Sequence, residues 1–131
     1  LGLENVAQSA IEPDEMLPAI AQGAIGIEWR KEDKQITDIL QKIHHTETEQ
    51  RLNIERAFLA ELDGSCQTPI AGLAVIEGSS LKFTGQVLRT DGSESISESA
   101  HCNIEDGPDL GREMAQNILA KAGPNFFDWK D

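Results

Sequence analysis

The chain has 131 residues, of which 39% are hydrophobic and 26% charged, and its formal net charge is −12. This length and composition predict one ordinary globular domain with a modest core. The strongly negative charge disfavours a surface that binds nucleic acid or anionic lipid. No stretch approaches the roughly 18 apolar residues of a membrane span, so we expect neither a nucleic-acid partner nor a membrane partner.

The N-terminal residues, LGLENVAQ, have neither the basic region nor the apolar region of a signal peptide. They also lack an initiator methionine, and we interpret the chain as a piece of a longer protein. Two cysteines are present, Cys66 and Cys102. Because nothing in the sequence suggests secretion, we expect both to be reduced in the cytoplasm.

The first 45 residues predict short elements only. Two prolines interrupt residues 1–20. The apolar run AIGIE at 24–28 has the length of a strand. Residues 33–43 carry isoleucine and leucine at the spacing of an amphipathic helix, which Asp33 can cap. A polar junction of two histidines and a threonine follows at 44–46, and it is the best domain boundary in the chain.

A longer helix is predicted to follow this junction. Thr46 and Glu49 fit a capping box at its start, and its wide apolar face predicts that it is largely covered. The helix is expected to stop at Gly64, which is a favourable residue for a helix end. Cys66 then lies within two residues of that end.

Three strands and a last helix complete the expected fold. The strands are IAGLAVIE at 70–77, LKFTGQVLR at 81–89 and the polar run SISESAHC, which we place at an edge of the sheet. Asp91-Gly92 before the third strand predicts a two-residue hairpin. The last helix is expected at 109–122. The order predicts an α+β fold in which helices cover a three-stranded antiparallel sheet.

Cys66 can be interpreted in two ways from its surroundings. A helix C-terminus and the nearby Asp63 both disfavour the thiolate, so a fast nucleophile of the protease kind is not expected. A single slow alkylation requires only access to an electrophile, and a covalent attachment point is therefore the sharper hypothesis. From composition alone, a structural cysteine in a turn is the commoner case.

A metal site is the other chemistry that the sequence could suggest. His44, His45, His101 and Cys102 are the candidate ligands. Adjacent histidines point apart, and no second pair has the spacing of metal ligands, so a solvated linker is favoured and no metal is expected.

Two blocks of the sequence resemble one enzyme family. LPAIAQGAIGIEWR at 17–30 and ERAFLAELDGSCQTPIAGLA at 55–74 are similar to hydroxymethylbilane synthase, also called porphobilinogen deaminase. The resemblance extends over essentially the whole chain, and the block around Cys66 is its most specific part. It implies a transferase of tetrapyrrole (haem) biosynthesis that joins four porphobilinogen units head to tail, with loss of ammonia, to give hydroxymethylbilane.

The resemblance also implies how the chain is divided. Residues 1–20 would end the second domain of the enzyme. Residues 21–44 would be the strand and helix that return to the first domain. Residues 45–131 would form the complete third domain. The two ranges before it would be remnants of the α/β second and first domains.

The site residues are implied by the same resemblance. Cys66 matches the cysteine that carries a dipyrromethane cofactor through a thioether. Gln22 and Gly23 match positions that line the cofactor pocket, and Arg30 matches an arginine after the returning strand. No catalytic residue is assigned within this chain, because the acidic catalyst and the arginine-rich cleft lie mostly in the first two domains.

Three further expectations follow. The chain alone is expected to be inactive and to carry no cofactor on Cys66. The two domains that bind porphobilinogen and hold the cofactor are present only in the full enzyme. Ile20 and Ala21 replace a proline and a glycine that are usual in the family, which leaves the conformation of that turn open. The alternatives from other classes are a stand-alone α+β binding or interaction domain and a small thiol enzyme or metal-binding module.

Overall fold

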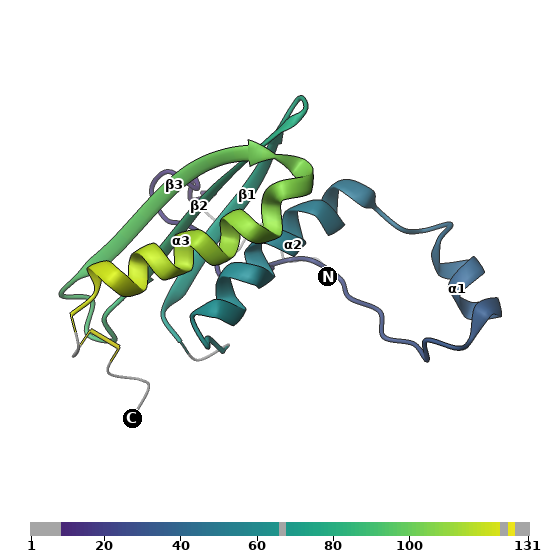
Figure 1. Cartoon of the computed structure of the whole chain (residues 1–131), viewed down its shortest axis with the longest axis horizontal. Helices are drawn as coiled ribbons and strands as arrows, with labels where there is room; N and C mark the ends of the chain where they lie inside the picture. The colour runs from purple at the N-terminus through teal and green to yellow at the C-terminus, as the bar shows by residue number, and fades with distance from the viewer. Residues whose placement is uncertain (1–8, 66–67, 124–125, 128–131) are drawn as a thin grey trace.

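A computed structural model describes residues 9–65, 68–123 and 126–127. Its three strands form one antiparallel sheet in the order β1-β2-β3, and the two long helices lie side by side on one face of it (Figure 1). This confirms the α+β class and the three-stranded sheet. The elements are α1 (Lys34–Leu40), α2 (Thr46–Glu61), β1 (Ile70–Glu77), β2 (Ser80–Leu88), β3 (Ser95–Asn103), a 3-10 turn η1 (Ile104–Asp106) and α3 (Gly107–Lys121).

The core lies between the sheet and the two helices. Alternate residues of β2, Leu81, Phe83 and Val87, are fully buried against them, as the period-two pattern predicts. The ring of Phe58 from α2 packs edge to face on Phe83, with centroids 5.2 Å apart. Gly111 lets the helices approach, because a Cβ at this position would lie 2.6 Å from the Ile54 carbonyl oxygen.

The two hairpins have turns of different lengths, and the second differs from the sequence prediction. The two-residue turn joins β1 to β2 at Gly78 and Ser79, and Gly78 takes a φ of +65°, at the first turn position where a type II′ turn requires glycine. The predicted two-residue turn at Asp91-Gly92 is wrong, because these residues lie within the longer loop 89–94. The Asp91 carboxylate there accepts hydrogen bonds from the backbone N–H and the hydroxyl of Ser93, which stabilises the wider loop.

The start of α2 also differs from the prediction. His45, not Thr46, is the N-cap residue, since its backbone is extended and Thr46 is already helical. The His45 Nδ1 accepts a hydrogen bond from the Thr48 N–H at 3.2 Å. The predicted capping box is therefore wrong, and Glu49 instead contacts the ring of His44.

The end of α2 forms a Schellman motif. The N–H of Gly64 donates to the Leu59 carbonyl at 3.0 Å, and that of Asp63 donates to the Ala60 carbonyl at 3.1 Å. The left-handed residue is Asp63, with a φ of +55°. Gly64 lies close to the core, because a Cβ there would lie 2.5 Å from the Leu59 Cδ1 and would make that side chain shift.

Residues 24–43 form an arm that projects from the domain (Figure 1). The apolar run at 24–28 forms no strand in this chain, and the Ile25 side chain is 93% exposed. Within the arm, Asp33 caps α1 as expected, by accepting a hydrogen bond from the Ile36 N–H at 3.1 Å. No residue of α1 is buried, so the arm lies outside the core.

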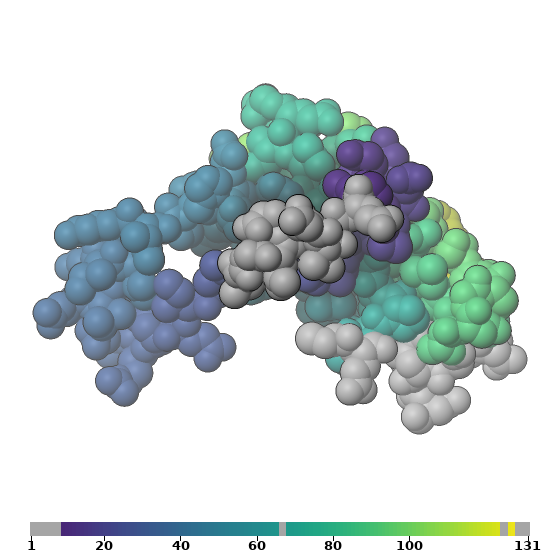
Figure 2. All heavy atoms as spheres, turned by 180° about the vertical axis from the view of Figure 1, so that it is seen from behind, coloured from purple at the N-terminus to yellow at the C-terminus, as the bar shows by residue number. Residues whose placement is uncertain are grey.

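The segment before the arm packs on the sheet. Residues 13–17 face the outer side of β1 and β2, and Figure 2 shows this N-terminal segment against that surface. Ala19 then forms a single antiparallel bridge with Ala71, and the Gly72 N–H donates to the Pro18 carbonyl at 3.0 Å. At the opposite edge lies β3, as predicted. Its inward-facing Glu98 accepts hydrogen bonds from Asn117 and Lys121.

Candidate functional site

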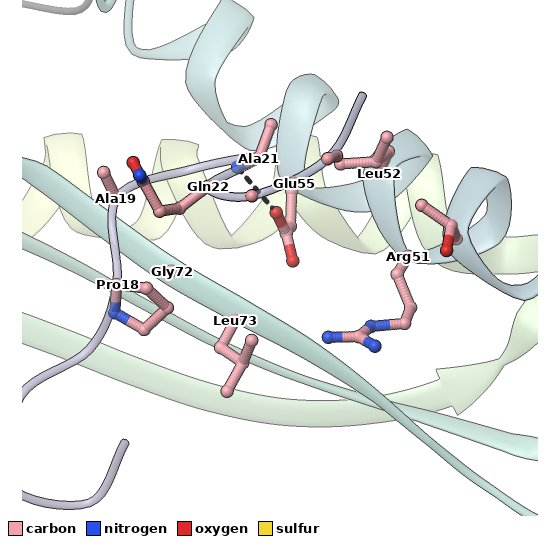
Figure 3. A pocket seen from close by; sticks show the side chains of 12 residues that line it. Pro18, Ala19, Ala21, Gln22, Arg51, Leu52, Glu55, Gly72 and Leu73 are labelled. Atoms are coloured by element: carbon pink, nitrogen blue, oxygen red, sulfur yellow. Dashed lines mark hydrogen bonds between the residues drawn. The ribbon is translucent and has the colours of Figure 1, made fainter. Parts of the chain in front are cut away.

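A hollow of about 190 Å³ lies where the N-terminal segment leaves the domain. It is lined by the turn at 18–24, by α2 between Thr48 and Glu55, and by Gly72 and Leu73 of β1 (Figure 3). Three separate stretches of the chain therefore meet at this place.

Two of the four predicted cofactor-binding residues, Gln22 and Gly23, line this hollow. The backbone N–H of Gln22 donates to the Ala19 carbonyl at 3.1 Å, and its exposed side chain points away from Glu55 (Figure 3). Gly23 takes a φ of +78°, which other residues rarely adopt. The sequence therefore identified a turn whose conformation depends on glycine.

Ala21 lies in this turn at a position where the family that the sequence resembles usually has glycine. Its φ is +59°, so alanine adopts the left-handed conformation that glycine favours. The neighbouring Ile20 packs its Cδ1 towards β1, where a Cβ on Gly72 would lie only 2.7 Å away. The left-handed conformation at position 21 is therefore present despite both substitutions.

Glu55 was not identified from the sequence, yet it is the one buried charged side chain in the described part of the chain, at 5% exposure. Its Oε2 accepts a hydrogen bond from the Ala21 N–H at 2.8 Å, and its Oε1 accepts one from the Ala74 N–H at 3.0 Å. Nε of Arg51, one helical turn earlier, donates to the Ala74 carbonyl at 2.6 Å. Two side chains of α2 thus bind the outer edge of β1.

A signal for Glu55 does exist in the sequence. Glu55 lies three residues before Phe58 and seven before Leu62, on the side of the helix that enters the core. A carboxylate on such a face needs hydrogen-bond donors, because burying an unsatisfied charge is costly. The identity of those donors could not be read from the sequence.

Cys66 lies outside the described residues, but the base of its loop is described. The Thr68 hydroxyl donates to the Ser65 carbonyl at 2.6 Å and accepts from the Ser65 N–H at 2.9 Å. The N–H of Leu88 donates to the Pro69 carbonyl at 3.0 Å, which fixes the far side of the loop to the sheet. The loop base is therefore held between the end of α2 and the start of β1.

Arg30 is not brought together with the other predicted site residues. It is exposed in the arm, and its carbonyl accepts a hydrogen bond from the Asp33 N–H at 3.0 Å. The structure thus groups Gln22 with Gly23 and places Arg30 elsewhere.

The remaining candidate residues have local roles. Cys102 is half-buried on β3, where burial and, to a lesser extent, the charge of Asp106 raise the pKa of its thiol. The ring of His45 caps α2. Among the described residues, no group of three or more His, Cys, Asp or Glu side chains could hold a metal ion.

Among the described residues, no helix has the length and apolar character needed to cross a bilayer.

Comparison with known proteins identifies the family. Residues 50–120 match the family model described as "Porphobilinogen deaminase, C-terminal domain", and residues 1–38 match "Porphobilinogen deaminase, dipyromethane cofactor binding domain". A porphobilinogen deaminase from Paracoccus denitrificans (strain Pd 1222) is 48% identical over 129 residues, which is 98% of this chain and 41% of the relative. The chain thus spans less than half of that relative's length. Because the C-terminal domain model alone matches more than half of its residues, the chain belongs to the porphobilinogen deaminase family.

Proposed function

We propose that this chain is the part of a hydroxymethylbilane synthase that anchors the dipyrromethane cofactor, with Cys66 as the attachment residue. The observation that carries the proposal is the match of the C-terminal domain model to residues 50–120, which include Cys66. The complete enzyme joins four porphobilinogen units head to tail, with loss of ammonia, to give hydroxymethylbilane. When bound, the cofactor supplies the pyrrole to which the first unit is joined.

The role of this chain in that reaction is to hold the anchor in place. The hydrogen bonds between Ser65 and Thr68 fix the base of the Cys66 loop on a rigid helix and sheet. A thioether forms only from a reduced thiol, so we place the enzyme in the cytoplasm.

The hollow beside Gln22 and Gly23 fits only part of a two-pyrrole group. Its volume of about 190 Å³ is below the roughly 300–1,000 Å³ of ligand pockets in general. Its wall contains Glu55, whose charge repels the carboxylates of a dipyrromethane. Those carboxylates need cationic partners. We assign these partners to the part of the enzyme that this chain does not span.

We retain the division of the chain into residues 1–20, 21–44 and 45–131 as part of the proposal. The exposed apolar side chains of Ile25, Ile27 and Trp29 support it, since an arm of this composition is expected to pack on another domain. Pro18 and Ala21 also support it, because they hydrogen-bond to residues of the range 45–131. The junction between residues 1–20 and 21–44 is therefore held on that third range.

The proposal is tested by completing the enzyme. We would join the 131-residue chain to the preceding part of the Paracoccus denitrificans relative and measure consumption of porphobilinogen. We expect turnover by the chimera, and none by the chain alone or by the Cys66→Ser chimera. Full activity of the Cys66→Ser chimera would exclude the anchoring role.

The alternative is a stand-alone α+β binding or interaction domain. It predicts that a well-folded chimera has no synthase activity and carries no adduct on Cys66. Circular dichroism of the chimera would establish that it is folded before this conclusion is drawn.

A further inference from the structure

We propose that Glu55 is the positioning residue that fixes the Gln22–Gly23 turn on the C-terminal domain. Its carboxylate is held by two backbone donors from different stretches, the Ala21 N–H and the Ala74 N–H. One donor belongs to the turn (Figure 3) and the other to the edge of the sheet, so a single side chain of α2 joins the two.

The burial of Glu55 makes this contact strong. A carboxylate that is 5% exposed must be compensated by hydrogen bonds, and each oxygen has one backbone donor. Nε of Arg51 donates to the Ala74 carbonyl, and no cation of the described residues lies within 4.0 Å of the Glu55 carboxylate. Release of Ala21 would therefore leave a buried negative charge with one donor fewer.

This contact lies at the point along the chain where the arm leaves the domain, so it sets where the arm begins. Ala21 is the last residue of the segment for which a hydrogen bond to the domain is observed, and the arm leaves after Gly23 (Figure 1). Gly23 has a φ of +78°, and no atom lies within 4 Å of a hypothetical Cβ there, so this position faces open space. Glu55 therefore holds the end of the turn that lies on the domain, directly before the chain leaves it.

A Glu55→Gln substitution tests this positioning role in the whole 131-residue chain. The glutamine has the same shape but one acceptor oxygen, and its NH₂ group would face a backbone donor. Ala74 is held by the ladder of β1 and β2, whereas Ala21 lies in a turn outside the strands. We therefore expect the turn, not the strand, to move away.

Amide hydrogen exchange, measured by NMR, reads this out residue by residue. In Glu55→Gln we expect the Ala21 and Gly72 amides to exchange at least about tenfold faster, while amides in the middle of α2 and β2 keep their protection. Glu47→Gln, an exposed position on the same helix, serves as the matched control and should change neither group. A purely structural role would accelerate all amides by one common factor.

A second variant keeps the test decisive if Glu55→Gln does not fold. Glu55→Asp retains the charge, but its side chain is one methylene shorter and cannot reach both donors. It is expected to give the same selective loss. Unchanged exchange at Ala21, or uniform acceleration in each variant that folds, would overturn the proposal.

The consequence for the cofactor rests on the proposed function. In the chimera, Glu55→Gln is expected to lower the fraction of chains that carry an adduct on Cys66, because Gln22 and Gly23 lose their fixed position. An unsubstituted chimera without adduct would defeat the proposed function and leave the exchange result standing. Normal loading of the Glu55→Gln chimera, with Ala21 deprotected, would limit the role of Glu55 to the turn.

Discussion

Ala21 is a residue whose conformation conflicts with its type. Its φ of +59° costs an L-residue roughly 1–2 kcal/mol relative to glycine, while glycine adds about 0.4–1 kcal/mol of entropy to the unfolded chain. We therefore expect Ala21→Gly to raise the free energy of unfolding by about 0.5 kcal/mol, measured by urea denaturation. Ala60→Gly, at an exposed helical position, should instead lower it by up to about 1 kcal/mol.

The two variants together test the left-handed conformation. If Ala21→Gly lowers stability by as much as Ala60→Gly does, the turn is not strained in the way that the φ angle indicates.

The two cysteines are expected to differ in reactivity. Burial and the nearby Asp106 raise the pKa of Cys102, so at a given pH less thiolate is present in the folded chain than in the unfolded one. We expect iodoacetamide to label Cys66 before Cys102 at pH 8, and Cys102 to label faster once urea unfolds the chain. Peptide mapping by mass spectrometry measures both rates, and equal labelling of the two thiols in the folded chain would contradict this prediction.

At the residue level, the sequence indicated Gln22 and Gly23, which line the hollow, but not Glu55, and the role of Cys66 stays a prediction. Gln22 and Gly23 were indicated by resemblance to a family and by turn chemistry, which is local. The partners of Glu55 are 34 and 19 residues away along the chain, so its hydrogen bonds depend on the tertiary fold. Only the conflict between a charge and an apolar helical face could have indicated its burial.

The helices and strands were predictable where hydrophobic periodicity is strong. Alternation in β2 and the spacing in α3 gave the core side of both elements, because burial imposes the same period on the sequence and the structure. The N-cap of α2 and the loop at 89–94 were not predicted, since several side chains could satisfy the same backbone groups. The run at 24–28 has the length of a strand but forms none, because a strand requires a neighbour to pair with.

The N-cap of α2 can be tested by comparing two neighbouring substitutions. His45→Ala removes the acceptor for the Thr48 N–H and should lower the free energy of unfolding by about 0.5–1 kcal/mol. Thr46→Ala affects the first helical residue and should change it by less than about 0.5 kcal/mol. Thermal or urea denaturation of both variants decides between them. A larger loss for Thr46→Ala would restore the capping box.

The whole molecule consists of a packed domain and a projecting arm, as Figures 1 and 2 show. The arm offers trypsin exposed sites at Arg30 and Lys31, whereas Arg56 lies within α2. We expect limited proteolysis to cut the arm at least about tenfold faster than α2, since cleavage requires local unfolding of helical backbone. Early cleavage at Arg56, or strong amide protection at 24–28 in a demonstrated monomer, would contradict this division.

The acidity of the whole molecule is consistent with an anchoring role. Asp and Glu number 23 against 11 Lys and Arg, so the chain as a whole repels substrates that carry carboxylates. An enzyme that polymerises such substrates needs a cationic cleft, which we assign to the length of its relatives that this chain does not span. The thiol and the cleft would then come from different parts of one protein.

The most direct test of the central claim is the intact mass of the chimera described above. We predict that its mass exceeds the sequence mass by one dipyrromethane, that peptide mapping places the addition on Cys66, and that Cys66→Ser abolishes it. The 131-residue chain alone should have its sequence mass, because a neutral thiol without a binding cleft lacks the effective concentration of a positioned pair, which can reach about 10⁵ M or more. A folded chimera without the adduct, or one that keeps it after Cys66→Ser, would contradict the account.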